Sequence, residues 1–328
     1  MKIVIVGQGA IGLLWYSHLN DLYPRDEIHT ENSLQQHSLT LRASNYKKNQ
    51  ATTASFQFTS MNGTTTDKIL HYATDADIQA ADVILLAVKS YQVKNALLQI
   101  SSLLKSNAII ILCHNGMGTL EELSDDVLNS HTILMMLTTN GCLRKLSSNT
   151  YPQIHITHTG VGYTDIGLLH QPASTKLPVV FPEKTIKSLL FLLKQALPPL
   201  FYHKNIKHSQ WTKLAINCVI NPLTAIHNVQ NGDILDRKFD TVISNILQEV
   251  LLVAYTQGVD LSLDALITTV KEVAKATQAN SSSMRCDVNN QQKTEIDYIN
   301  GYIHRLGLSE NIATPENTKL WQHISQLN

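Results

Sequence analysis

The first twenty residues constrain the fold of this chain more than any other stretch. Lys2–Val6 reads KIVIV, a short apolar run rich in β-branched residues, which is typical of a strand buried on both faces. Gly7–Gly12 reads GQGAIG and follows at once, and Leu13–Asn20 has the composition of a helix. A strand, a G-x-G-x-x-G turn and a helix in this order predict a dinucleotide-binding unit. The predicted cofactor-binding residues of the turn are Gly7, Gln8, Gly9, Ala10, Ile11 and Gly12.

Further apolar runs of strand length follow at intervals, and helical stretches lie between them. The predicted strands are Val83–Val88, Ala108–Cys113 and Thr132–Leu137. Alternation of strands and helices predicts an α/β fold with a Rossmann-type, doubly wound parallel sheet. Two regions interrupt the alternation. Leu39–Thr66 could hold short strands or an irregular insertion, and Tyr151–Gly167 is expected to form an antiparallel hairpin at the sheet edge.

The pattern changes near residue 207, where strand signals end and helical periodicity dominates. Ile243–Gln257, Leu263–Ala276 and Glu295–Arg305 are the clearest helices. A chain of 328 residues suits two domains better than one core. We therefore predict a dinucleotide-binding domain over residues 1–207 and an all-helical substrate and catalytic domain over residues 208–328.

Composition excludes several classes of protein. Lys plus Arg and Asp plus Glu both number 26, so no net charge favours binding to nucleic acid. The four cysteines show no C-x-x-C spacing, which predicts no metal site and no disulfide framework. The absence of a long apolar run predicts a cytoplasmic protein that does not enter a membrane. The expected partner is a small-molecule substrate, and the chain could be a monomer or a homodimer.

Trp211–Ala225 (WTKLAINCVINPLTA) carries the strongest signal of a binding face. Its residues are mostly apolar, yet Lys213, Asn217 and Asn221 recur every fourth residue, which places them on one side of a helix. A lysine in so apolar a setting needs a partner, and two neighbouring amides can bind a carboxylate or a hydroxyl. The face is therefore predicted to bind a substrate and to donate a proton.

Other polar residues have a functional and a purely structural interpretation. Lys89 and Asn115 each follow a predicted strand, where ligands of open α/β sheets gather, but Asn115 could simply form a turn with Gly116. Ser281–Ser283 could cap a helix. Glu295 could place its charge favourably in the first turn of a helix, or it could pair with Lys213.

The choice between NAD and NADP depends on residues near the end of the second strand, which we expect around Glu27–Thr30. An acidic side chain there would bind the ribose 2′-hydroxyl, and an arginine would bind a 2′-phosphate. Glu31 favours NAD, although it could be a solvated loop residue, and Arg42 lies further along the chain.

Taken together, these residues resemble those of the ketopantoate reductase (2-dehydropantoate 2-reductase) family over essentially the whole chain. The matching motifs are GQGAIG at 7–12, AVKSYQV at 87–93, HNGMGT at 114–119, KLAINCVINPLTAIHN at 213–228, SSM at 282–284, TEIDYINGYI at 294–303 and PENTKL at 315–320. The resemblance implies reduction of ketopantoate to (R)-pantoate with NADPH, on the route to pantothenate and coenzyme A.

The resemblance also implies roles for individual residues. Lys213 corresponds to the catalytic proton donor, and Glu295 to the glutamate that contacts the substrate end of the site. Lys89 and Asn115 correspond to residues where cofactor and substrate meet, so Lys89, Asn115 and Glu295 are also expected to contact the cofactor.

The same correspondence assigns substrate binding to Asn217 and Asn221, and assigns the substrate carboxylate to Ser283. In one respect the chain departs from the family. The arginine that pairs with the NADP 2′-phosphate in many members aligns near Ser33, which leaves NAD open as the cofactor. Two alternatives also stay open: a reductase of another small branched 2-oxo acid, and a dinucleotide-binding sensor without catalytic activity.

Overall fold

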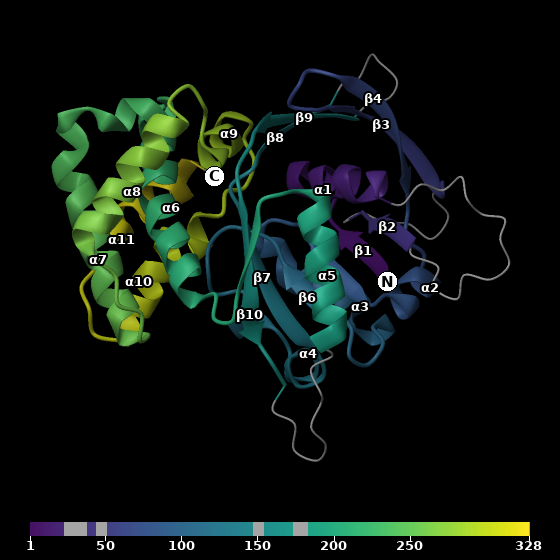
Figure 1. Ribbon diagram of the computed structural model, residues 1–328. Coiled ribbons are helices and arrows are strands. Elements are labelled where there is room, and N and C mark those ends of the chain that lie inside the picture. Colours follow the sequence, from purple (N-terminus) through teal and green to yellow (C-terminus); the bar gives the residue numbers. More distant parts are fainter. Residues whose placement is uncertain (23–37, 44–50, 147–153, 173–182, 328) are drawn as a thin grey trace, which may run out of the picture. The chain divides into compact units, whose positions relative to one another are not determined.

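The computed structural model describes residues 1–22, 38–43, 51–146, 154–172 and 183–327, which form two compact units (Figure 1). Unit 1 comprises Met1–Val88, Gln92–His114 and Leu123–Ile206. Unit 2 comprises Lys89–Tyr91, Asn115–Glu122 and Lys207–Asn328. The chain passes from unit 1 to unit 2 for the last time at residue 207, next to the predicted boundary. The two short segments of unit 2 lie within the range that we predicted for the first domain.

Unit 1 is built on a seven-stranded sheet of order β11-β10-β7-β6-β5-β1-β2. Its strands are β1 (Lys2–Val6), β2 (Ser38–Arg42), β5 (Val83–Leu86), β6 (Ile109–Leu112), β7 (Thr132–Thr138), β10 (Thr164–His170) and β11 (Leu200–His203). The five neighbouring strands β7, β6, β5, β1 and β2 are all parallel to one another, which confirms the predicted doubly wound sheet. β10 is antiparallel to β7, and β11 is parallel to β10.

Burial on both faces explains why the parallel strands are almost wholly apolar. Ile3 and Ile5 of β1 pack into one core with helices α1 (Ala10–Asp21) and α5 (Glu183–Ala196), while Val4 and Val6 are buried on the opposite face. The remaining helices of the unit are α2 (Asp75–Ala80), α3 (Val93–Ile100) and α4 (Asp125–Ser130). Because β2 and β5 flank β1 on opposite sides, the carboxyl end of β1 is the topological switch point of the sheet.

A second sheet, of order β4-β3-β9-β8, covers the outer side of α1. Its strands are β3 (Thr53–Thr59), β4 (Thr65–His71), β8 (Gly141–Leu146) and β9 (Ile154–Gly160). Tyr16 of α1 meets Phe56 of β3 edge to face with ring centroids 6.2 Å apart, and it is fully buried. Of the two interpretations of Leu39–Thr66, the short strands are correct, since this segment supplies β2, β3 and the start of β4.

The hairpin predicted for Tyr151–Gly167 is wrong. β9 pairs with β8 and β3 in the small sheet, whereas β10 pairs with β7 and β11 in the large one. The chain changes sheets at Gly160–Gly162, where a Cβ atom on Gly162 would lie 2.4 Å from the Thr139 carbonyl carbon. Alternating apolar residues around glycines indicated two strands correctly, but they do not identify the pairing partner of either strand.

In unit 2, all secondary structure from residue 207 to residue 327 is helical. The α-helices are α6 (Lys207–His227), α7 (Asp240–Thr256), α8 (Leu263–Ala276), α9 (Ser283–Asn289), α10 (Asn300–Ser309) and α11 (Pro315–Leu327). α6 contacts α7, α8, α9 and α11, so it is the central helix of the unit, and Trp211, Leu214 and Cys218 bury its apolar side. No helix within the described part of the chain is long and apolar enough to cross a membrane.

Candidate active site

The glycine turn of unit 1 has the backbone geometry that a dinucleotide requires. Gly7 follows β1 with φ +113°, and a Cβ atom there would lie 2.4 Å from the Ala87 carbonyl oxygen. A Cβ atom on Gly12 would lie 2.3 Å from the Gly7 oxygen. Gly9 is the N-cap of α1, and a Cβ atom there would meet nothing outside its own chain neighbours and helix closer than the Ala87 oxygen at 3.8 Å. The turn can therefore present the first N–H groups of α1 to a phosphate, as predicted for residues 7–12.

The residue that ends the second strand differs from the expected one. β2 runs parallel to β1 over Ser38–Arg42, so Arg42 ends it, and Glu31 and Ser33 lie outside the described residues. The Arg42 guanidinium is largely buried: Nη1 donates to the Ala73 carbonyl at 2.8 Å, and Nη2 pairs with Asp75 at 2.6 Å. The second strand therefore does not end near Glu27–Thr30, as predicted, but at Arg42. The side chain at the strand end is thus a cation. The sequence pattern misplaced the strand because SLTLR is short and polar.

In unit 2, α6 carries the predicted polar stripe. Lys213 and Asn217 are half-buried, and Asn221 is only 6% exposed. The Asn217 Nδ2 atom is buried and has no hydrogen-bond partner among the described residues. An amide N–H group left in this state costs about 1–3 kcal/mol, which an oxygen atom of a bound ligand would offset. The stripe is therefore a prepared acceptor-binding face.

Glu295 lies at the centre of a second polar group in unit 2. It is 4% exposed, and its two carboxylate oxygens accept hydrogen bonds from the Ser90 N–H group at 2.9 Å and the Asn115 amide at 3.3 Å. The Lys89 ammonium lies 3.7 Å from the same carboxylate and 2.6 Å from Asp287. The structure thus brings together Lys89, Asn115 and Glu295, although they are separated by as many as 206 positions in the numbering. The predicted pairing of Lys213 with Glu295 stays a prediction.

Burial and charge act against each other in this group. Burial lowers the pKa of Lys89, but the carboxylates of Glu295 and Asp287 outweigh it, and the net pKa is raised. For Asp287, burial prevails over the nearby Lys89 charge and raises the pKa of the carboxyl group. Asp287 is not among the predicted site residues. It stands in a polar helical turn with no distinguishing motif, and only its contact with Lys89 reveals it.

Of the serines at the start of α9, one caps the helix and another is accessible to a ligand. Ser282 is the N-cap: its hydroxyl accepts from the Arg285 N–H group at 3.1 Å and lies 2.7 Å from the Thr224 hydroxyl of α6. Ser283 is the first residue of α9, and it is exposed. Capping therefore occupies Ser282 and leaves the Ser283 hydroxyl accessible to a ligand.

The loop that carries Asn115 is fastened to the helical unit by Tyr298. The Met117 N–H group donates to the Tyr298 carbonyl at 2.7 Å, and the Tyr298 hydroxyl donates to Glu122 at 2.8 Å. Gly116 has φ +82°, and a Cβ atom there would lie 2.3 Å from the Tyr298 oxygen. Asn115 thus serves as more than a turn residue, because the loop is held where its amide reaches Glu295.

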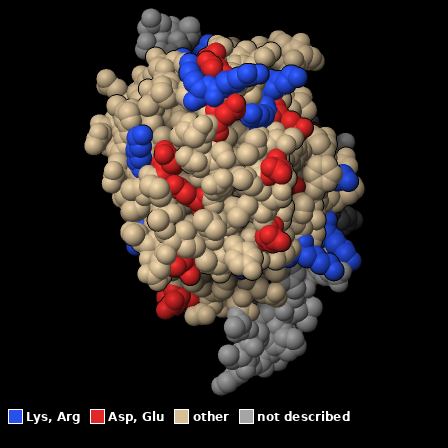
Figure 2. Space-filling view, turned by 90° about the vertical axis from the view of Figure 1, so that its left-hand side faces the viewer, with Lys and Arg blue, Asp and Glu red and all other residues tan. Residues whose placement is uncertain are grey.

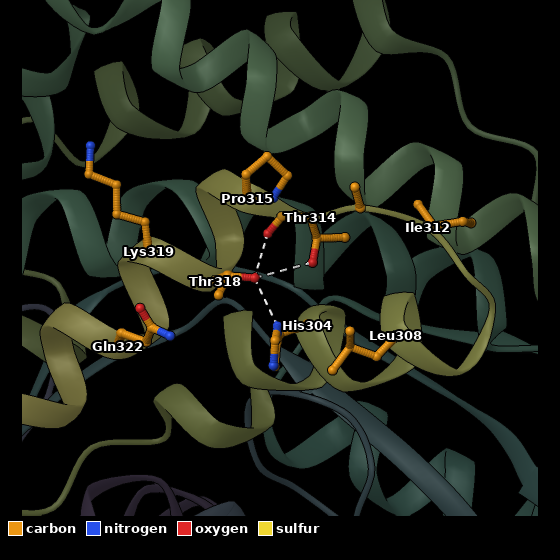
Figure 3. Close-up of a pocket in the computed structure, with 9 residues that line it drawn as sticks. His304, Leu308, Ile312, Thr314, Pro315, Thr318, Lys319 and Gln322 are labelled. Carbon is orange, nitrogen blue, oxygen red and sulfur yellow. Dashed lines mark hydrogen bonds between the residues drawn. The ribbon is translucent and has the colours of Figure 1, made fainter.

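A separate hollow of about 420 Å³ in unit 2 lies at α10 and α11 (Figure 3). His304 Nδ1 lies 2.8 Å from the Thr318 hydroxyl on its wall, and Leu308 and Lys319 also line it. None of the predicted site residues belongs to this hollow. On the molecular face shown in Figure 2, basic and acidic side chains are mixed, with wide uncharged areas between them.

Comparison with known proteins agrees with this arrangement. The family described as "Ketopantoate reductase PanE/ApbA" matches residues 3–171, and "Ketopantoate reductase PanE/ApbA C terminal" matches residues 205–328. The 2-dehydropantoate 2-reductase of Vibrio cholerae is 33% identical over 327 residues, covering 100% of this chain and 98% of its own. The chain belongs to the ketopantoate reductase family.

Solved structures show the same fold at lower identity. The PanE/ApbA family ketopantoate reductase from Ralstonia eutropha aligns with a TM-score of 0.76 at 22% identity, covering 100% of this chain and 98% of its own. D-mandelate dehydrogenase, solved with NADH and anilino(oxo)acetate, aligns with a TM-score of 0.79 at 21% identity and the same coverage. At these identities the likeness extends to the fold of this family member and no further.

Proposed function

We propose that this enzyme reduces 2-dehydropantoate to (R)-pantoate with NADPH, and that Lys213 donates the proton. The observation that carries the proposal is the stripe on α6, where half-buried Lys213 shares a face with half-buried Asn217 and buried Asn221. Such a face suits a small 2-oxo acid, because the lysine can meet the ketone while the amides bind the carboxylate and the hydroxyl. Family membership supports the same substrate.

The chain's own residues supply binding and the proton. Bound NADPH would supply the hydride to the ketone carbon. The Lys213 ammonium would donate a hydrogen bond to the ketone oxygen, stabilise the growing negative charge and then transfer its proton. The Asn217 Nδ2 atom would donate to a substrate oxygen, and Asn221 and the exposed Ser283 hydroxyl would complete the binding of hydroxyl and carboxylate.

The group around Glu295 would orient the reactants. Glu295 orients the Asn115 amide by accepting a hydrogen bond from its N–H group. The Lys89 ammonium pairs with Asp287 and lies beside Glu295, so it offsets part of the negative charge of these two carboxylates.

We assign the cofactor preference to NADPH on the position of Arg42. It ends β2, where a dinucleotide-binding sheet contacts the ribose 2′ position of the cofactor, and its guanidinium is held by Ala73 and Asp75.

The product of the proposed reaction, pantoate, leads to pantothenate and coenzyme A. The four cysteines are free thiols, which suits a protein of the reducing cytoplasm.

Another 2-oxo acid is the second candidate substrate. D-mandelate dehydrogenase shares the fold and was solved with NADH and an oxo acid, so the same architecture accepts an aromatic oxo acid and NADH in that protein. The polar α6 stripe favours ketopantoate here, because an aromatic side chain would leave the buried Asn217 amide without an acceptor.

The test is a comparison of initial rates on purified protein with ketopantoate or benzoylformate and with NADPH or NADH. We expect ketopantoate with NADPH to give the highest kcat/KM. Lys213→Ala should lower kcat about 10²–10⁴-fold, the usual contribution of a general acid, while the NADPH dissociation constant changes less than about twofold. Lys207→Ala, which removes an exposed lysine from the same helix, is the matched control and should keep the wild-type rate.

The possible results separate the candidates. A higher kcat/KM for benzoylformate would replace the substrate, and a normal kcat in Lys213→Ala would remove the lysine from the mechanism. Dinucleotide binding without turnover of either acid would identify a sensor.

A further inference from the structure

Arg144 is a half-buried cation that the proposed function has not used. It lies on β8 in unit 1 and is half-buried, and its Nε atom is buried with no hydrogen-bond partner among the described residues. A buried N–H group without an acceptor costs free energy, and an oxygen atom of an anionic ligand would offset that cost.

The strand places Arg144 toward the glycine turn. Side chains alternate along β8, so Arg144 shares a face with Cys142. The Cys142 thiol donates to the Ala10 carbonyl at 3.3 Å, and Ala10 is the first residue of α1. β8 is in contact with α1. Arg144 therefore extends from the face of β8 that lies against the start of α1.

Tyr72 connects the same cation to the turn itself. Burial lowers the pKa of the Arg144 guanidinium, and the Tyr72 phenol acts on it in the opposite direction. The Tyr72 hydroxyl accepts a hydrogen bond from Gln8 Nε2 at 3.1 Å, and Gln8 is the second residue of GQGAIG. Tyr72 also bridges to Leu41, next to Arg42. Arg144 thus approaches the turn on the side of the β2 end.

We propose that Arg144 binds a phosphate group of the dinucleotide, from a strand outside the nucleotide-binding sheet. A guanidinium offers several N–H donors in a planar fork and holds its charge when buried, which matches a phosphate better than a lysine would. The proposal rests on the dinucleotide binding of the proposed function. It adds a contact from the small sheet, which the G-x-G-x-x-G fingerprint does not include.

The test compares Arg144→Gln with Lys145→Gln by titration calorimetry of NADP⁺, 2′,5′-ADP and ADP. Lys145 is the matched control because it is the next residue of β8, is exposed and points to the opposite face. We expect Arg144→Gln to raise the dissociation constant of NADP⁺ at least tenfold, whereas Lys145→Gln changes it less than twofold. Equal losses for ADP and 2′,5′-ADP would assign Arg144 to the pyrophosphate, and a loss for 2′,5′-ADP alone would assign it to the 2′-phosphate.

Thermal unfolding of Arg144→Gln without ligand distinguishes a ligand-binding role of Arg144 from a structural one. Removing an uncompensated buried charge should leave the Tm of Arg144→Gln unchanged or higher, whereas a structural arginine would lower it. Unchanged affinities for all three ligands in the folded variant would overturn the proposal. If Arg144→Gln does not fold, Arg144→Lys keeps the charge, and its NADP⁺ affinity should fall about threefold or more. Wild-type protein that binds none of the ligands would instead refute the proposed function.

Discussion

Arg42 is the residue on which the proposed preference for NADPH depends. Its guanidinium is held at the end of β2 by a carbonyl at 2.8 Å and by Asp75 at 2.6 Å, so its orientation is fixed before any ligand arrives. A guanidinium matches the geometry of a phosphate, and its position at the end of β2 is where a 2′-phosphate would lie. Preorganisation of this kind reduces the entropy lost on binding.

Substitution of Arg42 should therefore change cofactor preference more than turnover. We expect Arg42→Gln to lower kcat/KM with NADPH about 10- to 100-fold, the effect of one charged hydrogen-bonded contact, and to change kcat/KM with NADH less than about threefold. Steady-state kinetics with both cofactors in the same variant provides an internal control for folding. Equal losses with NADPH and NADH would show that Arg42 supports the fold and does not select the cofactor. Arg237→Gln, which removes an exposed arginine, should alter neither value.

Among the elements, the segment Asn115–Glu122 of unit 2 follows the end of β6. It is short, and its conformation depends on Gly116 and on the backbone and hydroxyl of Tyr298. The desolvated Tyr298 hydroxyl, bonded to Glu122, has its pKa raised to about 12, so it remains a donor throughout the physiological range. The loop is therefore a rigid support for Asn115.

Gly116→Ala should disrupt this support. The added Cβ atom would meet the Tyr298 oxygen at 2.3 Å, and the backbone has φ +82°, so we expect a loss of about 2–5 kcal/mol in the free energy of unfolding. Gly63→Ala is the matched control, because Gly63 also has φ +82° but has nothing within 4 Å. Its loss should be only about 1–2 kcal/mol. Urea unfolding measures both, and equal losses would show that the contact with Tyr298 is unimportant.

The packing of the small sheet on α1 should depend on pH. His18 of α1 lies against Phe58 and His158, with ring centroids 5.5 and 5.6 Å away. Burial and then His158 lower the pKa of His18, which outweighs the opposite effect of Asp21. The unfolded chain therefore binds more protons than the folded chain near pH 6, and stability falls as the pH decreases through this range.

Urea midpoints at pH 7.5 and pH 5.5 would measure this dependence. We expect the loss of stability on acidification to be smaller in His18→Gln than in wild type, because the lowered pKa of His18 no longer contributes. His323→Gln, at an exposed position in α11, should leave the loss unchanged. A wild-type loss that persists in full in His18→Gln would assign the dependence to other groups.

At the scale of the whole molecule, the two units have separate hydrophobic cores. One core contains Ile5, Leu14 and Leu189, and the other contains Trp211, Leu247 and Ile303. The proposed dinucleotide turn belongs entirely to unit 1, whereas the proposed substrate residues belong entirely to unit 2. Each ligand should consequently stabilise mainly one unit.

Differential scanning calorimetry can test this division. NADPH at 100 times its dissociation constant should stabilise unit 1 by about 2.7 kcal/mol and raise the melting temperature of one transition. Pantoate without cofactor should instead raise the temperature of the other transition. A single transition that both ligands shift equally would contradict independent unfolding of the two cores.

Local features could be predicted from the residues alone: the G-x-G-x-x-G turn after β1, the buried parallel strands, the helical second half and the polar stripe on α6. Each of these features depends on residues that are close together in the sequence, where side-chain periodicity and glycine backbone geometry apply directly. Tertiary structure alone decided the partners of distant residues. It separated β9 from β10, placed Arg42 at the end of β2, and joined Lys89 to Asp287 and Glu295 across some two hundred positions. Local patterns contain no information about such pairs, because long-range contacts arise only when whole elements pack.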